Sequence, residues 1–259
     1  MIQRIFSLWM VVSLATGALW AAADAFIGEW KLNPSKSTLI DQMKVERVAG
    51  NTYAFEFSVG RTETIAVDGT DQQGLGGTTL SVTVKGPDEW KVVRKKDGRI
   101  LLTAVWKLSE DGHALNDDYT EFGANGSSTH VEYVYKRIGG TAGFAGTWQS
   151  TTQTVNSVYV LTVTPYQGDG LSFVYTTADI TKNLRFDGKD YPTVGRNAVP
   201  GSVCSARRVS DHSLEITDKV DGKTTDTQQL AISPDLKTLT ITVHPVGRRD
   251  PNILIFERQ

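Results

Sequence analysis

Several short stretches of the chain alternate between apolar and polar or small residues, which is the pattern of β-strands that bury one face. The segments 52–58, 81–84 and 238–243 each alternate in this way. Successive side chains of a strand point to opposite faces, so each segment places one row of side chains in a core. Beyond the N-terminal region, no long segment shows the 3.6-residue apolar rhythm of a helix. The pattern predicts an all-β protein without substantial helix in the mature chain.

Turn signals separate the alternating stretches at short intervals. Asp68-Gly69, Asp97-Gly98, Asp187-Gly188 and Asp221-Gly222 are examples. Asp-Gly pairs tolerate the positive φ that tight hairpins require. The chain therefore predicts a meander of antiparallel strands in which each strand pairs mostly with its neighbours in sequence.

One motif occurs twice and divides the chain into two repeats. Phe26-Ile27-Gly28-Glu29-Trp30 opens the first repeat and Phe144-Ala145-Gly146-Thr147-Trp148 opens the second. Each repeat closes on a basic residue, Arg137 in the first and Arg258 in the second. We expect one domain over 24–138, a small-residue linker over 139–143 and a second domain over 144–259.

Each repeat has roughly eight alternating stretches, which suits an up-and-down β-barrel. Closing such a sheet removes its two exposed edges, and the interior is then filled by side chains or holds one small ligand. A two-sheet sandwich is the alternative for a similar strand count. A single large barrel is less favoured, because each repeat has its own opening Trp and closing Arg.

The opening Trp and closing Arg suggest how each barrel closes. A guanidinium over an indole face gains a cation–π contact and ties the first strand to the last. We expect Trp30 to stack with Arg137 and Trp148 to stack with Arg258, so these four residues are assigned to structural closure.

The Gly-x-Trp start, the run of hairpins and the closing Arg resemble the lipocalin (calycin) pattern. Residues Gly28 to Ser37 are more narrowly similar to the start of uncharacterised secreted bacterial proteins with lipocalin-like domains. The resemblance implies two consecutive lipocalin-like barrels. Each repeat is shorter than a typical lipocalin and lacks that family's usual disulfide.

The N-terminal segment 1–23 is interpreted as a signal peptide. Arg4 supplies the positive start, an apolar run follows, and Ala21-Ala22-Ala23 offers a small-residue cleavage site, with cleavage after Ala25 as the near alternative. A transmembrane anchor is the other interpretation, but the apolar run is short and no basic cluster follows it. The chain is therefore expected to be secreted or periplasmic, with no stable membrane insertion after cleavage.

Composition and charge exclude several partners and cofactors. The formal net charge is −2 and no basic patch is apparent, so no nucleic acid is expected as a partner. The single cysteine, Cys204, cannot form an internal disulfide and is expected to be a half-buried strand thiol. The four histidines stand at no metal-ligand spacing, and Asp117-Asp118 is interpreted as a solvated turn. No metal, cofactor or oligomeric state is indicated.

The aromatic residues are the best candidates for a site, because no catalytic motif is present. Inward aromatics either fill a small barrel, which is the commoner outcome, or line an apolar pocket with polar hydroxyls. The first repeat, which is richer in them, is the better candidate, and its expected ligand-binding residues are Tyr53, Phe55, Phe57, Trp106 and Tyr133.

Three functions remain open. The first is an exported, non-catalytic binding protein for a small apolar or amphipathic ligand. The second is an enzyme whose active groups converge from several strands of one barrel, since a fold does not fix a function. The third is a protein–protein interaction module that uses an external apolar patch. A cluster of ionisable groups inside one barrel would favour the second.

Overall fold

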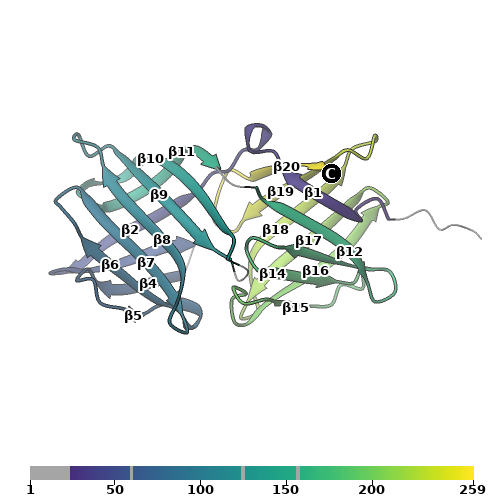
Figure 1. The fold of residues 1–259 in the computed structure, drawn as a ribbon, viewed down its shortest axis with the longest axis horizontal. Helices are drawn as coiled ribbons and strands as arrows, with labels where there is room; N and C mark the ends of the chain where they lie inside the picture. The colour runs from purple at the N-terminus through teal and green to yellow at the C-terminus, as the bar shows by residue number, and fades with distance from the viewer. Residues whose placement is uncertain (1–23, 59–60, 124–125, 156–157) are drawn as a thin grey trace, which may run out of the picture.

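The computed structural model describes residues 24–58, 61–123, 126–155 and 158–259, so the predicted signal peptide lies outside the described residues. The chain forms two antiparallel ten-stranded barrels that lie side by side, which confirms the predicted all-β class (Figure 1). Among the described residues the only helical elements are two 3₁₀ turns, η1 (Pro34–Lys36) and η2 (Leu75–Gly77).

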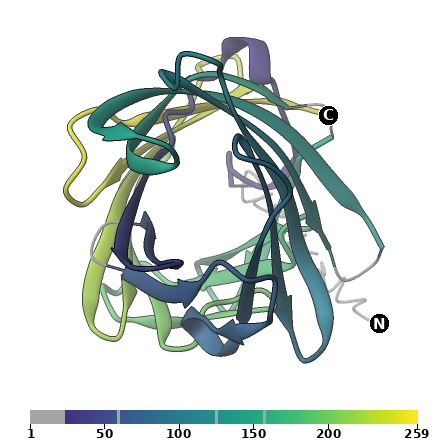
Figure 2. The same ribbon diagram turned by 90° about the vertical axis from the view of Figure 1, so that its left-hand side faces the viewer.

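Barrel I is the sheet of strands β2 to β11. In chain order these are β2 (Gln42–Ala49), β3 (Thr52–Ser58), β4 (Arg61–Ala66), β5 (Gln72–Gln73), β6 (Thr79–Val84), β7 (Glu89–Lys96), β8 (Arg99–Leu108), β9 (Ala114–Phe122), β10 (Ser128–Ala142) and β11 (Ala145–Val155). Figure 2, which views barrel I from its own end of the molecule, shows these strands arranged as a ring.

Barrel II contains strand β1 and strands β12 to β20, and its sheet is fully closed. The strands are β1 (Gly28–Leu32), β12 (Val160–Tyr166), β13 (Gly170–Tyr175), β14 (Ile180–Leu184), β15 (Tyr191–Val194), β16 (Ser202–Ser210), β17 (Ser213–Val220), β18 (Lys223–Ile232), β19 (Thr238–Pro245) and β20 (Asn252–Arg258). Both barrels have more strands than the roughly eight expected, because β5 and β15 are too short to show an alternating pattern.

The first strands of the two repeats are exchanged between the barrels. Strand β1, from the first repeat, pairs with β12 and β20 of barrel II. Strand β11, from the second repeat, pairs with β10 and β2 of barrel I (Figure 1). Each barrel therefore contains strands from both repeats, unlike the contiguous domains 24–138 and 144–259 that the repeat predicts.

The connection between β10 and β11 explains the exchange. The segment 139–143 is not a linker, because β10 continues to Ala142, which pairs with Ala145 of β11 across a tight turn. A turn this short forces β11 to lie beside β10 as a hairpin. Strand β11 thereby occupies the place that β1 would need in barrel I, and β1 completes barrel II.

The exchange reverses the predicted Trp–Arg pairs while keeping their chemistry. The Arg258 guanidinium lies 4.0 Å from the Trp30 ring centroid, and the Arg137 guanidinium lies 4.1 Å from that of Trp148. The predicted pairs, Trp30 with Arg137 and Trp148 with Arg258, are therefore wrong. All four residues still close a barrel. Trp30 lies opposite Arg258 where β1 pairs with β20, and Trp148 lies opposite Arg137 where β11 pairs with β10.

The repeated Phe-x-Gly-x-Trp motif follows from this closure. The Trp30 indole donates to the Phe26 carbonyl at 2.9 Å, and the Trp148 indole donates to the Phe144 carbonyl at 3.0 Å. A Cβ at Gly28 would lie 2.6 Å from Nη1 of Arg258, so the glycine leaves room for the guanidinium. Burial of the indole and the phenyl ring fixes one end of each barrel.

Barrel I is closed less completely than barrel II. The edge strands β4 and β5 are not paired through their backbones. Instead, the Gln72 side-chain amide donates to the Ala66 carbonyl at 2.7 Å and accepts from the Ala66 amide at 2.8 Å. A side chain thus supplies the pair of hydrogen bonds that a ladder would make, and the edge is protected.

Candidate functional site

The inward side chains of barrel I change from apolar to polar along the barrel axis. On β9 the inward row is Leu115, Asp117 and Tyr119, and on β7 it is Trp90, Val92 and Arg94. The two-residue period of a strand sets this order. The end closed by Arg137 is consequently apolar, whereas the other end carries ionisable groups.

The apolar end of barrel I is filled by aromatic rings. Trp90 stacks on Phe144 with ring centroids 4.0 Å apart, and Tyr53 contacts Trp90 edge-on at 5.1 Å. Phe55 is fully buried and contacts Trp90 and Trp106. Tyr53 and Phe55 therefore belong to this packed floor, and neither lines the cavity above it.

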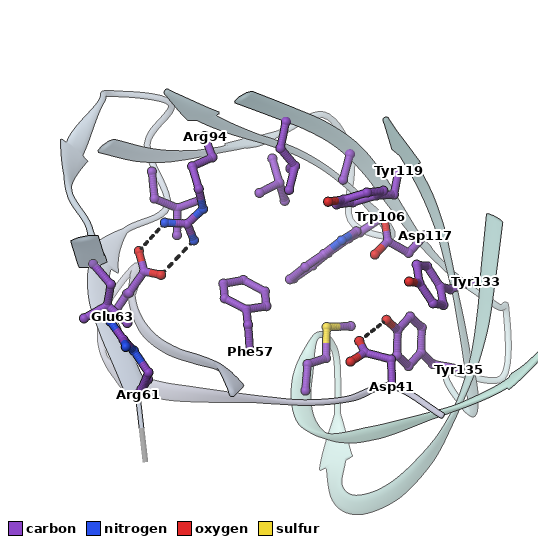
Figure 3. Close-up of a pocket in the computed structure, with 16 residues that line it drawn as sticks. Asp41, Phe57, Arg61, Glu63, Arg94, Trp106, Asp117, Tyr119, Tyr133 and Tyr135 are labelled. Carbon is purple, nitrogen blue, oxygen red and sulfur yellow. Dashed lines mark hydrogen bonds and ion pairs between the residues drawn. The ribbon is translucent and has the colours of Figure 1, made fainter. Parts of the chain in front are cut away.

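A cavity of about 330 Å³ lies above the aromatic floor (Figure 3). Phe57, Trp106 and Tyr133, three of the expected ligand-binding residues, line it. The complete lining is Asp41, Met43, Phe57, Arg61, Glu63, Leu75, Leu80, Val92, Arg94, Leu102, Ala104, Trp106, Asp117, Tyr119, Tyr133 and Tyr135.

One wall of the cavity combines two carboxyl groups with three tyrosines. Asp41 precedes β2, and its Oδ2 accepts a hydrogen bond of 2.6 Å from the Tyr135 hydroxyl. Asp117 lies between Tyr119 along β9 and Tyr133 across the ladder to β10. Burial, together with the Asp41 and Asp117 carboxyl groups, raises the pKa of Tyr135, so its hydroxyl remains a donor at neutral pH.

Asp117 is the unusual member of this wall. It is 7% exposed, and its Oδ1 has no hydrogen-bond partner among the described residues. Burial raises its pKa to about 7, the charges of Asp41 and Asp118 act in the same direction, and the Trp106 indole opposes them. The Trp106 Nε1 acts on this carboxyl group as a weak donor, although it meets no acceptor in the described part of the chain with full hydrogen-bond geometry. The expectation of a solvated turn at Asp117-Asp118 is therefore wrong for Asp117, which lies in mid-strand and faces the interior.

The opposite wall carries an ion pair that spans from β7 to β4. Arg94 donates from Nη2 to Glu63 Oε1 at 2.7 Å and from Nη1 to Glu63 Oε2 at 3.0 Å. Nη1 also donates to the Thr78 hydroxyl at 2.8 Å. Figure 3 shows this pair on one side of the cavity and Asp41 with Tyr135 on the other, with Phe57 and Trp106 between them. Arg94 is thus already engaged by a carboxylate.

At the corresponding positions of barrel II, the described residues form no acidic and tyrosine wall. Trp106 pairs with Asp117, and Asp117 pairs with Tyr133, in the β8–β9–β10 ladder. The equivalent positions of the β18–β19–β20 ladder hold Leu230, Ile241 and Leu254. These aliphatic side chains join a core cluster that also includes Phe173, Leu214 and Phe256. The two repeats differ most where the barrel I cavity has its carboxyl groups.

Barrel II keeps a buried ion pair at the position of the Arg94–Glu63 pair. Lys182 Nζ donates to Asp218 Oδ2 at 2.5 Å, and Gln228 Nε2 donates to the same oxygen at 2.7 Å. Although burial opposes it, the surrounding Tyr175 and Asp218 groups raise the pKa of Lys182, which therefore stays charged. A charged, paired lysine is a poor nucleophile, so this cluster reads as structural.

The barrel I cavity opens into a chamber of about 1060 Å³ between the two barrels. Phe57, Leu102 and Tyr119 line both spaces, and the barrel II side contributes Asp226 and Val243. The connection between β1 and β2 borders this chamber. There Arg248 of barrel II donates to the carbonyls of residues 40 and 42, each at 3.1 Å.

The sequence analysis does not include Asp41, Asp117, Tyr119 or Tyr135 among the expected ligand-binding residues. Asp117 carried a readable signal, since it occupies an inward position in an alternating strand between Leu115 and Tyr119. Asp41 carried none, because it precedes a strand and enters the cavity only through the fold. Cys204 lies on β16 and is buried, and burial raises the pKa of its thiol to about 11.

The described residues contain no group of three or more His, Cys, Asp or Glu side chains that could hold a metal ion. Within the same residues, no helix has the length and apolar character needed to cross a membrane. Comparisons of the chain with protein-family models, with curated proteins and with solved structures give no match. The site must therefore be interpreted from its own geometry.

Proposed function

We propose that the protein is an exported, non-catalytic binding protein that holds a small amphipathic ligand in barrel I. The observation that carries the proposal is the aromatic cavity of about 330 Å³, at positions where barrel II is packed with aliphatic side chains. Cavities of roughly this size, mostly apolar with a few polar groups, are typical of small-molecule sites. The lipocalin-like resemblance of the sequence agrees with a ligand inside a barrel.

The residues that line the cavity favour an amphipathic ligand over a purely apolar one. Its floor side offers Phe57, Trp106 and Leu80, while its walls offer carboxyl, hydroxyl and guanidinium groups. A wholly apolar ligand would exclude water from the wall and leave Asp117 Oδ1 without a partner among the described residues, which is unfavourable. An apolar body with a polar head satisfies both surfaces. The inter-barrel chamber gives such a ligand a route to the cavity.

Displacement of the cavity volume tests the proposal. Ala104 is buried and lines the cavity, so Ala104→Phe places a ring in the ligand space. The probe is N-phenyl-1-naphthylamine, whose fluorescence rises in apolar surroundings. We expect saturable binding to the wild type at one site and at least about tenfold weaker binding to Ala104→Phe.

Ala231→Phe is the matched control, since Ala231 is an exposed residue of strand β18 in barrel II. It should bind the probe as the wild type does. Equal binding by Ala104→Phe and the wild type, with both variants folded, would place the probe outside the cavity and overturn the proposal. A lack of saturable binding to the wild type would overturn it as well.

A second candidate is an enzyme that transfers a proton within the same cavity. It is favoured by one observation, the buried Asp117 carboxyl, whose pKa near 7 suits a general acid or base. Mass spectrometry of ligand recovered from the purified protein separates the two functions. A ligand returned unchanged supports binding, whereas conversion by the wild type and not by Asp117→Asn supports catalysis.

A further inference from the structure

We infer that the ligand of the barrel I cavity carries a protonated amine, which Asp117 and Asp41 bind while the aromatic rings enclose its apolar body. The inference rests on the proposed function and specifies its ligand class. It starts from the carboxyl group of Asp117, which is buried and whose Oδ1 has no hydrogen-bond partner among the described residues. A buried acceptor without a partner is destabilising, so its retention points to a donor brought by a ligand.

The charges around the cavity favour a cationic donor. Asp41 lies on the same wall as Asp117 and disfavours the ionisation of Asp117 unless a positive charge is present. Two arginines of barrel I line the cavity. Arg94 is bound through two hydrogen bonds by Glu63, and Arg61 lies beside Glu63, across the cavity from Asp117 (Figure 3). Of the two acidic residues, Arg248 of barrel II forms an ion pair with Asp41, at 3.5 Å, and none with Asp117 among the described residues. Asp117 thus has no ion-pair partner in the described part of the chain.

The aromatic lining suits an ammonium group as well. Phe57, Trp106, Tyr119 and Tyr133 all face the cavity, and Figure 3 shows Tyr119, Tyr133 and Trp106 around Asp117. The negative faces of such rings attract a cation, and the attraction is stronger when the cation is desolvated. Two carboxyl groups among aromatic rings therefore offer an amine both charge and ring contacts.

Barrel II shows that a barrel of this type does not need an acidic wall. Ile241 and Leu254 occupy the places of Asp117 and Tyr133 and are packed in the core cluster or against it. Since aliphatic residues build the wall in one barrel, the fold itself does not require a carboxyl group at this position. A binding site for the ammonium head of a ligand explains why the buried Asp117 lies in the barrel that has the cavity.

Three probes with the same naphthyl body and different heads test the inference. They are 1-naphthylmethylamine, 1-naphthalenemethanol and 1-naphthoate, titrated calorimetrically at neutral pH. The wild type should bind the amine at least about tenfold more tightly than the alcohol and should bind the carboxylate most weakly. Asp117→Asn keeps the shape of the side chain and should bring the amine and the alcohol to within about threefold of each other.

Asp118→Asn is the matched control, because Asp118 is the next residue of β9 and its side chain is 63% exposed. It should keep the preference for the amine. If the wild type binds the alcohol or the carboxylate as tightly as the amine, the amine inference is overturned and the binding function stands. If no probe binds and N-phenyl-1-naphthylamine does not bind either, both fail. Retained binding of that neutral probe by Asp117→Asn shows that the variant is folded.

Discussion

Barrel I crosses its interior with an ion pair from Arg94 to Glu63, whereas barrel II uses Asp218 and Lys182 at equivalent positions. Phe55 pairs with Glu63 on β3 and β4, and Phe173 pairs with Lys182 on β13 and β14. The two barrels therefore keep a buried pair at the same level and reverse its polarity. What the position requires is neutralisation across the barrel rather than a particular sign of charge.

The two barrels are alike at one end and differ at the other. At one end both barrels keep the same Phe, Gly, Trp and Arg arrangement, with closely similar cation–π and hydrogen-bond distances. At the other end Asp117 and Tyr133 of barrel I face a cavity, and their counterparts Ile241 and Leu254 pack into a core. Closure has been kept in both repeats, and the interior has diverged in one.

The largest expected effect concerns barrel closure, because a tryptophan of one repeat stabilises the barrel formed mainly by the other repeat. Trp30 belongs to the first repeat, yet it is fully buried in the core of barrel II. Trp30→Ala should lower the free energy of unfolding by about 3–5 kcal/mol, because a large buried ring is lost. Hydrogen exchange should accelerate at β20 and remain slow at β10. Trp148→Ala should produce the reverse distribution.

Urea unfolding gives the magnitude for both tryptophan variants, and hydrogen exchange gives the location. Val48→Ala, which changes an exposed residue of barrel I, serves as the control and should leave both quantities close to the wild type. Faster exchange at β10 in Trp30→Ala would mean that β1 belongs to barrel I in solution, contrary to the exchanged topology.

The next effect concerns the reversed ion pairs. Arg94→Met leaves Glu63 buried and unpaired, and should lower the free energy of unfolding by about 3 kcal/mol. The double variant Arg94→Met with Glu63→Leu should recover most of that loss, since no buried charge remains. Lys182→Met, alone and with Asp218→Leu, should behave in the same way in barrel II. Urea unfolding measures all four variants, and a double variant no more stable than its single would show that the pair is not mutually neutralising.

A smaller effect of opposite sign is expected when barrel I is given the barrel II residue. Asp117→Ile removes a buried carboxyl group whose Oδ1 is without a partner among the described residues. Thermal and urea unfolding should show a gain of about 1–3 kcal/mol at neutral pH. The same variant should lose the preference for 1-naphthylmethylamine. A variant less stable than the wild type would indicate that Asp117 has a structural partner.

More of the fold than of the candidate site could be predicted from the sequence. The alternation of apolar and polar residues and the Asp-Gly turns predict the all-β class. The repeated Gly-x-Trp motif predicts that a Trp and an Arg close each barrel. Both features are predictable because the signals are local in the sequence. The identity of each Trp–Arg pair was not predictable from composition, since it depends on the tight turn at Ala142 and Ala145. Phe57, Trp106 and Tyr133 were recognised as aromatic strand residues, whereas Asp41 reaches the cavity only through tertiary structure.

The last prediction concerns the pH dependence that Asp117 gives to barrel I. Burial raises the pKa of Asp117 from 3.8 to about 7, with Asp41 and Asp118 acting in the same direction and Trp106 opposing them. Between these two values the unfolded chain has released the Asp117 proton and the folded chain has retained it. The folded state therefore binds more protons, and its stability must fall as the pH rises from about 4 to about 7.

The fall attributable to Asp117 should not exceed about 1.4 kcal/mol per pH unit, and it should level off above about pH 7. Urea unfolding of the wild type and Asp117→Asn across this range isolates it as the difference between two curves. Asp118→Asn should keep most of the fall, because burial is the largest cause of the raised pKa of Asp117 and the Asp118 charge is a smaller one. Saturating 1-naphthylmethylamine should reduce the fall, because an ammonium group stabilises the ionised carboxylate. Parallel curves for the wild type and Asp117→Asn would show that the buried carboxyl group titrates normally, and would remove the electrostatic difference between the barrels.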